Sequence, residues 1–434
     1  MTTSIETQRA ERAEHVTDFS QHIHGSDQLH LAWVYDTATT MTVIWRNCEP
    51  SSSSTLEYRA TGDSDWIAVS AKRRLTDEKG ALEEVTLTGL TPSTRYAYRI
   101  RCGEGTVGES REFSTGPERE GYTAMDIAYV SDTGLIGRAD GLSDGTAHVI
   151  KEIARRDPLL VLHGGDFAYF DTDRRFQWLE EAIDYFFNQM VPIASRAPMM
   201  PTYGNHELMY VLQERFEPWA ERYATPEGSE GRLNYSYDIG QVHFVSICAV
   251  EFDDPLPQDR VDWVMADIKQ AAADGRPWII PVLHVAPFAE GQNHPSNLAL
   301  RAQLGPIFEE LGIRLVLTSH DQSYERTFPL VDVPTANTPT SSSLDEYHVD
   351  DGTIWVKVSP GGKRSNINKS FSTFATEEPP HWTAVRSNTH HCFAMLHFGA
   401  QGELEVEVVG VKGDGSDPVQ LDRFTLTAPA RSAG

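Results

Sequence analysis

The feature that most constrains the fold of this chain is a change in hydrophobic pattern near residue 120. Between residues 29 and 115, short segments such as "MTVIWRN" (41–47) alternate apolar and polar residues, with Ser, Gly and Asp between segments. Alternation with a period of two is typical of strands that bury one face, so this region predicts an antiparallel β-sandwich. After residue 124, apolar segments alternate instead with amphipathic stretches of helical length, as "LLVLHGGD" (159–166) does with "RFQWLEEAIDYFFNQM" (175–190). That order predicts βαβ units in an α/β domain.

The two patterns divide the chain into three predicted parts. Residues 1–25 form a polar N-terminal tail, residues 26–116 a β-sandwich, and residues 124–429 an α/β domain. Two strand pairs without intervening helices, at 235–248 and 392–410, indicate that the α/β domain holds two mixed sheets rather than one parallel sheet. The length of 434 residues exceeds the size at which one core keeps growing, which also favours two domains.

The charge of the chain narrows the range of partners. With 37 basic and 63 acidic side chains, the formal net charge is −26 at pH 7, which opposes binding to nucleic acid and to anionic membranes. The net charge does not exclude small anionic substrates, because a local cluster of metal ions can outweigh distant carboxylates. The N-terminus lacks the apolar core of a signal peptide, and no apolar run approaches the length of a membrane span. We therefore expect a soluble, cytoplasmic protein as written, or a secreted one if a leader has been removed; the oligomeric state is unknown.

The cysteines predict no disulfide scaffold. There are four, Cys48, Cys102, Cys248 and Cys392, and none has the C-x-x-C spacing of a metal or redox site. A single bridge between Cys48 and Cys102 is one alternative, and reduced, partly buried thiols are the favoured one.

Metal-capable side chains follow five of the apolar segments in the α/β region. They stand at the C-terminal ends of the predicted strands, where open α/β sheets bind their ligands. A turn-forming Asp or Asn at one strand end is common, but five consecutive strand ends with such groups are hard to reach by chance. Their carboxylate, amide and imidazole groups suit a pair of metal ions that activates water. The residues are Asp132, Asp166, Asn205 with His206, His284, and His320.

The blocks that contain these residues resemble the five ordered blocks of the metallophosphoesterases. They are "SDTG", "GGDFAY", "GNHE", "VLHV" and "SHDQSYER", in the order of that family. More narrowly, the chain is similar to the purple acid phosphatases, in which a fibronectin-like domain precedes the catalytic one. The N-terminal region agrees, because "LTGLTPSTRYAYRI" (87–100) resembles the corner of a fibronectin type III domain. Leu90 and Pro92 would lie at this corner, Tyr96 would be its tyrosine, and Trp45 would be the core tryptophan.

The resemblance implies a fold and a set of metal ligands. The fold is a fibronectin type III-like all-β sandwich, followed by an α/β metallophosphoesterase sandwich of two mixed sheets flanked by helices. Asp132 would bind a first metal ion, and Asp166 would bridge the first and the second. Tyr169 matches the tyrosine whose phenolate binds ferric iron and colours the purple enzymes. The second site would be completed by Asn205, His284 and His320.

The resemblance also implies a role for His206, which would hydrogen-bond the phosphoryl oxygens or protonate the leaving group. Two alternatives stay open. Tyr169 could instead be a packed aromatic side chain with a hydrated hydroxyl. His206 could support the site from behind without touching the substrate.

One position departs from the family pattern. The last block normally ends His-x-His, and the second histidine binds the first metal ion; here Gln322 takes its place. Glutamine offers one neutral oxygen, which is a weaker donor to iron or zinc than imidazole. Three interpretations stay open: Gln322 is a ligand, it hydrogen-bonds a metal-bound water, or it faces solvent and the site has lost a metal ion.

The first two interpretations are favoured, because every other ligand position is intact. With Gln322 as a ligand, the first site contains only oxygen donors, which favour hard ions such as Fe(III), Mn(II) or Mg(II) over Zn(II). We expect Fe(III) at the Asp132, Asp166 and Tyr169 site. The second site, formed by Asp166, Asn205, His284 and His320, would hold Fe(II), Mn(II) or Zn(II).

Two further histidines are expected near the site. His294 lies in "AEGQNHPSN" (289–297), where the family has a substrate-facing loop, so it is a candidate contact to the phosphate or leaving group. The alternative is an ordinary histidine on a surface loop. His163 is expected to pack beneath the site and to donate a hydrogen bond.

Other charged residues near the motifs are expected to be structural. Glu325 and Arg326 predict an ion pair with each other, with Arg326 as a secondary candidate for anion contact. Lys363 and Arg364 follow two glycines in "SPGGKRSN". No helix start follows to supply aligned backbone amides, so a solvated loop is favoured over a phosphate cradle.

Together these residues predict a metal-dependent phosphoric ester hydrolase that acts on small phosphate esters. The favoured reaction is phosphomonoester hydrolysis by a hydroxide held between two metal ions, with His206 assisting the leaving group. One alternative is a phosphodiesterase with the same centre. Another is a catalytically weakened protein that binds phosphorylated ligands; the intact His206 argues against it.

Overall fold

The structure, a computed structural model, describes residues 26–47, 54–77, 80–102, 106–208, 216–250 and 254–427. The predicted tail, residues 1–25, and Cys48 lie outside these ranges, and so does any bridge between Cys48 and Cys102. Cys102, Cys248 and Cys392 are buried.

The N-terminal region is the predicted β-sandwich. One sheet has the order β1-β2-β6-β5, and the other has the order β4-β3-β7-β8 with β9 paired to β7. Among the described residues, neighbouring strands in both sheets pair antiparallel. The strands are β1 (Ser26–Ala32), β2 (Met41–Asn47), β3 (Ser54–Ala60), β4 (Ile67–Ser70), β5 (Lys72–Asp77), β6 (Gly80–Leu87), β7 (Arg95–Cys102), β8 (Thr106–Val107) and β9 (Arg111–Ser114).

The fibronectin-like corner is confirmed. The Tyr96 hydroxyl accepts a hydrogen bond from the Thr91 backbone N–H at 2.8 Å, which ties the start of β7 to the turn that precedes it. Leu90 and Trp45 are buried in the sandwich core, as predicted. The bond uses the polar end of a buried tyrosine to fix the chain reversal between the two sheets.

The C-terminal region contains two mixed seven-stranded sheets, with the orders β12-β11-β10-β23-β24-β25-β20 and β13-β14-β15-β16-β21-β17-β22. In the first, β10 is parallel to β11 and antiparallel to β23, and in the second, β16 is parallel to β15 and β21. The strands are β10 (Met125–Val130), β11 (Leu160–His163), β12 (Met199–Pro201), β13 (Tyr235–Ile239), β14 (Val242–Ile247), β15 (Trp278–Leu283), β16 (Leu315–Thr318), β17 (Tyr324–Thr327), β20 (Glu346–Tyr347), β21 (Ile354–Lys357), β22 (Thr383–Ser387), β23 (His391–Phe398), β24 (Leu404–Val411) and β25 (Val419–Leu426), with a separate pair β18 (Leu330–Val331) and β19 (Thr338–Pro339).

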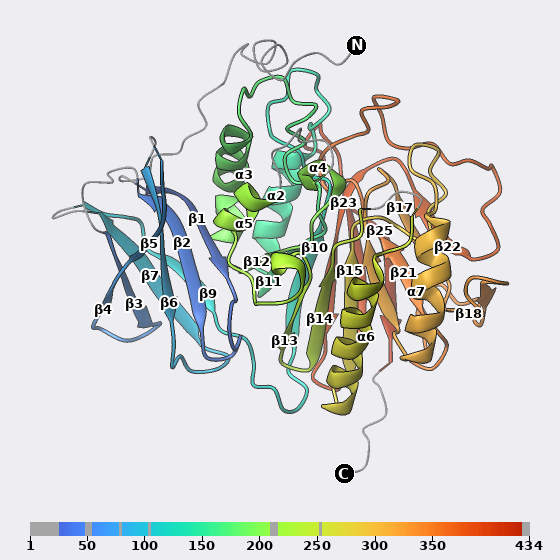
Figure 1. The fold of residues 1–434 in the computed structure, drawn as a ribbon, viewed down its shortest axis with the longest axis horizontal. Coiled ribbons are helices and arrows are strands. Elements are labelled where there is room, and N and C mark those ends of the chain that lie inside the picture. The colour runs from blue at the N-terminus through green and yellow to red at the C-terminus, as the bar shows by residue number, and fades with distance from the viewer. Residues whose placement is uncertain are drawn as a thin grey trace.

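Helices cover the outer faces of both sheets (Figure 1). On the first sheet, apolar side chains of α2, α3 and α5 pack against β10, β11 and β23. On the second sheet, α6 and α7 pack against β14, β15 and β16. The helices are α2 (Thr146–Arg156), α3 (Leu179–Ala194), α4 (Asn205–Leu208), α5 (Glu217–Arg222), α6 (Gln258–Ala273) and α7 (Leu298–Glu310). The predicted α/β sandwich of two mixed sheets flanked by helices is therefore confirmed.

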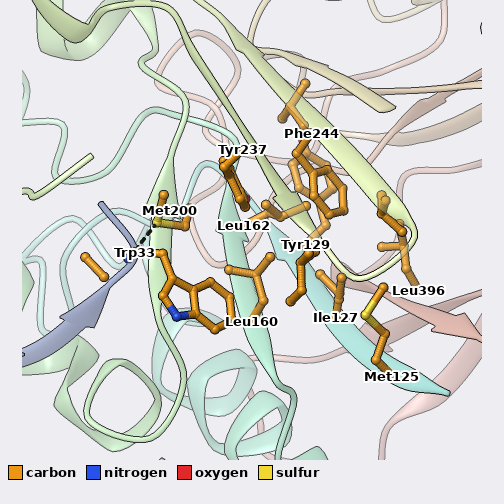
Figure 2. Close-up of a cluster of buried hydrophobic side chains, with 14 of the residues drawn as sticks. Trp33, Met125, Ile127, Tyr129, Leu160, Leu162, Met200, Tyr237, Phe244 and Leu396 are labelled. Carbon is orange, nitrogen blue, oxygen red and sulfur yellow. Dashed lines mark hydrogen bonds between the residues drawn. The ribbon is translucent and has the colours of Figure 1, made fainter. Parts of the chain in front are cut away.

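A continuous apolar core lies between the two sheets. Figure 2 shows Leu162 and Tyr129 of the first sheet next to Tyr237 and Phe244 of the second. Because each sheet is covered on both faces, its strands are apolar along their length, and this explains why the sequence showed continuous apolar runs there. The parallel strands β10, β11, β15 and β16 end at the edge where the predicted metal ligands lie.

The β-sandwich is docked on the α/β region through α3. Arg46 of β2 donates to Asp184 of α3 at 2.6 Å and also pairs with Asp27, and the Gln28 backbone N–H donates to Asn188 at 2.9 Å. Nearby, the Trp33 backbone N–H donates to the Met200 sulfur, with 3.5 Å between nitrogen and sulfur (Figure 2). Buried polar groups are costly unless each has a partner, so these bonds fix one orientation of the sandwich.

The same helix also reaches the loop that follows β10. The Gln189 side chain donates to the Gly134 carbonyl at 2.8 Å and accepts the Ile136 N–H at 2.9 Å. Helix α3 thus contacts the sandwich with one side and the Asp132 loop with another. Across the described ranges, we find no helix with the length and apolar character that a bilayer crossing requires.

Candidate metal centre

Three of the predicted ligands converge at one edge of the two sheets. Asp166 follows β11, His284 follows β15, and His320 follows β16. One ligand atom from each lies within 4.8 Å of the others, and all three side chains are buried. The His284 Nδ1–H donates to the Gly164 carbonyl at 2.7 Å, which leaves Nε2 directed at Asp166 Oδ2, 3.2 Å away. Such a hydrogen bond fixes the tautomer that a metal ligand requires.

Asp132 and Tyr169 lie at the same place. The Tyr169 hydroxyl donates to Asp132 Oδ1 at 2.8 Å. Asp132 Oδ2 accepts the Ser131 hydroxyl at 2.7 Å and the His320 backbone N–H at 3.2 Å. The strand ends of both sheets therefore meet at Asp132, although 188 positions separate it from His320 along the chain.

Asn205 and His206 begin the short helix α4 and join the group through its backbone. The His206 N–H donates to Asp166 Oδ1 at 3.0 Å. Gly204, which precedes them, lies so close that a Cβ there would be 2.2 Å from Asp166 Oδ1, so only glycine fits. The Asn205 Oδ1 atom is buried and has no hydrogen-bond partner among the described residues.

The sequence analysis did not identify Glu207 as part of this arrangement. Its buried carboxylate accepts the backbone N–H groups of Asp166, Phe167 and Gly204, at 2.8, 2.8 and 3.0 Å. Glu207 thereby ties the "GGDFAY" block to the "GNHE" block. Its position in the same block as the predicted ligand Asn205 and the predicted substrate contact His206 was the available signal, but a glutamate in the first turn of a helix is common on other grounds.

Backbone strain is concentrated at the predicted ligands. The φ angles of Asp132, Asp166, Tyr169 and His320 are +50°, +55°, +53° and +77°. Few residues other than glycine adopt this region, and those that do are frequent where a surrounding structure holds a functional geometry. The left-handed turn at each strand end aims these side chains back across the edge of the sheets.

Gln322 is buried, with 3% of its surface exposed, so the interpretation that it faces solvent is wrong. Its amide nitrogen donates to the His320 carbonyl at 2.9 Å, and its Oε1 atom is buried without a hydrogen-bond partner in the ranges described. A buried acceptor without a partner is costly in a protein interior. Like Asn205 Oδ1, it is an oxygen that a cation would satisfy, so the donor set present fits metal ions.

The electrostatics of the site agree with a cation-binding role. Burial alone would lower the pKa of His284, but the adjacent Asp166 carboxylate outweighs it and raises that pKa to about 9. Burial would raise the pKa of Asp166, yet His284 and His206 hold it well below its usual range. Protons and cations compete for such groups, so metal binding would release the His284 proton.

Comparisons with known proteins agree with this geometry. Residues 26–115 match the family described as "Purple acid Phosphatase, N-terminal domain", and residues 125–324 match "Calcineurin-like phosphoesterase". The chain is a purple acid phosphatase-like metallophosphoesterase. It therefore belongs to a family of phosphoric ester hydrolases, which implies a binuclear metal centre and small phosphate-ester substrates.

Individual relatives are about a quarter identical to the chain over the aligned residues. "Acid phosphatase type 7" of Homo sapiens is 27% identical and covers 90% of this chain and 88% of its own length. "Purple acid phosphatase 23" of Arabidopsis thaliana is 26% identical over 68% of this chain, and the chain spans 65% of that relative. Among solved structures, a purple acid phosphatase from yellow lupin (Lupinus luteus) seeds shares the fold, with a TM-score of 0.77 at 20% identity over 94% of this chain and 75% of its own.

In this metallophosphoesterase, His206 is held by a carboxylate that the sequence analysis missed. The His206 Nδ1 atom lies 2.6 Å from Asp171 Oδ1, and Nε2 lies 3.9 Å from Asp166 Oδ2. Burial works to lower the pKa of His206, but Asp171 and Asp166 together raise it. Asp171 therefore fixes the tautomer with hydrogen on Nδ1 and directs Nε2 at the centre.

His294 also lies at the centre. Its ring is 4.0 Å from the ring of His320, measured between centroids, and the side chain is half-buried. The predicted ligands are at most 4% exposed, whereas His206 and His294 retain partial access to solvent. Among these side chains, His206 and His294 are thus the ones that solvent reaches.

Lys363 contradicts the prediction of a solvated loop. Its side chain is fully buried, and its amine lies 4.0 Å from the centre of the Tyr169 ring. The loop is pulled inward because the Lys363 N–H donates to the Asp132 carbonyl at 3.1 Å, and burial lowers the pKa of the amine to about 7. Arg364, the next residue, does point outward and pairs with Asp144 at 3.1 Å.

The prediction that Glu325 and Arg326 pair with each other is wrong. They are neighbours on β17, so their side chains point to opposite faces of the sheet. Glu325 pairs with Lys357, and Arg326 pairs with Asp422 at 2.6 Å. Arg326 is fully buried, and its guanidinium is occupied by the Asp422 carboxylate, the Tyr347 hydroxyl and the Leu344 carbonyl.

His163 is buried beneath the site, as predicted. Its Nδ1 accepts the Gly165 N–H at 3.3 Å, so the hydrogen is on Nε2, which donates to the Thr133 hydroxyl at 3.1 Å. This bond links the ends of β10 and β11 below Asp132 and Asp166.

Proposed function

We propose that this chain is a phosphomonoesterase with two metal sites that share Asp166. The first site is formed by Asp132, Asp166, Tyr169 and Gln322 and takes Fe(III). The second is formed by Asp166, Asn205, His284 and His320 and takes Fe(II), Mn(II) or Zn(II). We also propose that residues 26–116 and 124–429 are the two domains.

One observation supports this proposal above the others. Buried ligand atoms of Asp166, His284 and His320 lie within 4.8 Å of one another, and Asn205 Oδ1 and Gln322 Oε1 are buried without hydrogen-bond partners among the described residues. A donor set with unsatisfied oxygens and crowded imidazoles is stable only if cations complete it. When bound, the two ions supply an activated water and neutralise charge on the phosphoryl oxygens.

The protein's own groups then orient the ester and move one proton. His206 and His294 contact the phosphoryl oxygens or the leaving group from the accessible side of the centre. Since Asp171 holds hydrogen on His206 Nδ1, the Nε2 atom is the one that can give a proton to the leaving oxygen. The near-complete burial of the ligands excludes bulk water from the reacting groups.

The test is hydrolysis of p-nitrophenyl phosphate and bis-p-nitrophenyl phosphate by protein reloaded with iron, manganese, zinc or magnesium, with metal content measured in parallel. We expect about two ions per chain and faster hydrolysis of the monoester. His206→Ala should abolish most turnover, whereas His348→Ala, on a side chain that is 63% exposed, serves as a matched control and should not. Faster diester hydrolysis would make the chain a phosphodiesterase, and no turnover with any metal would make it a binding protein.

A further inference from the structure

A fully buried ionic cluster lies beside the metal centre. Asp321, Glu325 and Lys357 are each at most 2% exposed. The Lys357 ammonium lies 2.6 Å from Asp321 Oδ2 and 2.5 Å from Glu325 Oε1, and it donates to the Ser323 hydroxyl at 2.8 Å. Burying three charges is costly, and one ammonium against two carboxylates leaves the cluster with negative charge to spare. A chain that needed only a packed core here could use apolar side chains.

Both carboxylates also accept hydrogen bonds from backbone N–H groups of one loop, residues 285–297, which joins β15 to α7. Glu325 accepts the Glu290 N–H through both oxygens, at 3.0 and 2.9 Å. Asp321 Oδ1 accepts the His294 N–H at 3.3 Å. Gly291 rests directly on the same carboxylate, because a Cβ there would lie 2.0 Å from Asp321 Oδ2.

The other side of this loop is held by residues 372–375. The Gln292 N–H donates to the Thr373 carbonyl at 2.8 Å, and the Ala375 N–H donates to the Glu290 carbonyl at 2.9 Å. The Ser372 N–H donates to the Gln322 carbonyl at 2.9 Å, so this segment is also tied to the block that contains His320. The loop is therefore fixed from both sides, and His294 is the residue that this arrangement holds against His320.

We propose that Asp321, Lys357 and Glu325 are positioning residues that hold His294 against the second metal site, where it contacts the phosphoryl group. The inference rests on the proposed function, because it assigns His294 to the substrate of that same centre. His320 and Gln322 lie at the centre, whereas the Asp321 side chain between them accepts the His294 N–H from the loop. None of the three positioning residues touches substrate or metal.

A double-mutant cycle tests this, with Asp321→Asn, His294→Ala and the two combined. The measurements are kcat and KM for p-nitrophenyl phosphate, inhibition by inorganic phosphate, and metal content. Asp321→Asn should lower kcat/KM by about 10- to 100-fold, since a misplacement of about 1 Å can cost that much. In the His294→Ala background the same substitution should change kcat/KM by less than about twofold, because its effect passes through His294. Metal content should stay at the wild-type value in all three variants.

Two further variants protect the test against a folding defect. Gly291→Ala places a methyl group against the Asp321 carboxylate while keeping all three charges of the cluster, and it should reproduce the effect of Asp321→Asn. Glu405→Gln removes a carboxylate from the exposed pair with Arg423 and should leave activity unchanged.

The outcomes separate this inference from the proposed function. Equal losses with and without His294, wild-type activity in His294→Ala, or loss of metal from Asp321→Asn would each overturn the positioning role while leaving the phosphatase assignment intact. Absence of turnover in metal-loaded wild-type protein would overturn the proposed function itself.

Discussion

The two halves of the candidate centre are built differently, although they share Asp166. On the side of the proposed first site, Asp132 already accepts hydrogen bonds from Ser131, Tyr169 and the His320 N–H. On the other side, two imidazoles and Asn205 Oδ1 face the centre with few bonds to the protein. In the first half, the carboxylate of Asp132 is held in place by hydrogen bonds. In the second half, most of the candidate metal-ligand atoms are imidazole nitrogens.

This contrast suggests that the two halves select ions by different means. A set of oxygen donors favours hard ions, whereas imidazoles suit the softer divalent ions of the first transition row. Gln322 in place of histidine sharpens the contrast, because it removes the one nitrogen donor that the family pattern would put in the first half. Substitutions at these residues should change how the two halves differ in metal binding and in their effect on turnover.

Replacing the shared residue should have the largest effect. Asp166→Asn removes the carboxylate that we propose both ions share, and we expect both ions to be lost together with a fall in activity of roughly a thousandfold or more. Metal analysis and p-nitrophenyl phosphate hydrolysis measure the two effects. Retention of one full equivalent of metal would show that the halves bind independently.

Removing His206 should affect turnover but not metal content. His206→Ala deletes the group that Asp171 orients toward the centre, and we expect kcat to fall about a hundredfold. Asp171→Asn should show a smaller loss in the same direction, because the imidazole remains but its tautomer is no longer fixed. A loss of metal in His206→Ala would assign this residue to one half of the centre instead.

Restoring the family's histidine should make the halves more alike. Gln322→His adds an imidazole to the first half, and we expect its affinity for Zn(II) to rise on the order of tenfold. Competitive titration with a zinc chelator gives the affinity of each site. Unchanged zinc affinity would refute ligation by Gln322.

The smallest effect on turnover is expected for Tyr169→Phe. This variant loses one hydrogen bond to Asp132, which is worth about 1 kcal/mol, or roughly fivefold in rate. If the Tyr169 phenolate binds Fe(III), the iron-loaded wild type should absorb in the visible range and the variant should not. A wild type without such a band under oxidising, iron-replete conditions would contradict that bond.

Much of the fold could be predicted from the sequence, because its signals are local. The strand Met41–Asn47 has the bounds that periodicity suggested, and the helical stretch at 175–190 overlaps the helix Leu179–Ala194. In contrast, the strands at 67–77 and the helix Gln258–Ala273 were not predicted. Strand β4 (IAVS) has only four residues and is largely exposed, and β5 (KRRLTD) is mostly polar. The helix has a weak apolar face, and the polar Arg260 is among its buried residues.

For the candidate site, the sequence identified residues but not their supports. The strand-end positions of Asp132, Asp166, His284 and His320 were visible as a pattern, whereas the partners that hold them come from elsewhere in the chain. Lys363, for example, is buried because its backbone bonds to Asp132, more than two hundred positions away, and no local pattern reports such a contact.

The position of α3 gives the β-sandwich a mechanical connection to the reaction centre. Arg46 and Gln28 of the sandwich form hydrogen bonds with this helix. Gln189 of the same helix forms a hydrogen bond with the loop that follows Asp132. A ligand that changed the orientation of the sandwich would therefore also displace α3 and, through it, the loop that follows Asp132. Removing the β-sandwich would take Arg46 and Gln28 away from Asp184 and leave Arg222, 3.4 Å from Asp184 Oδ1, as its guanidinium partner.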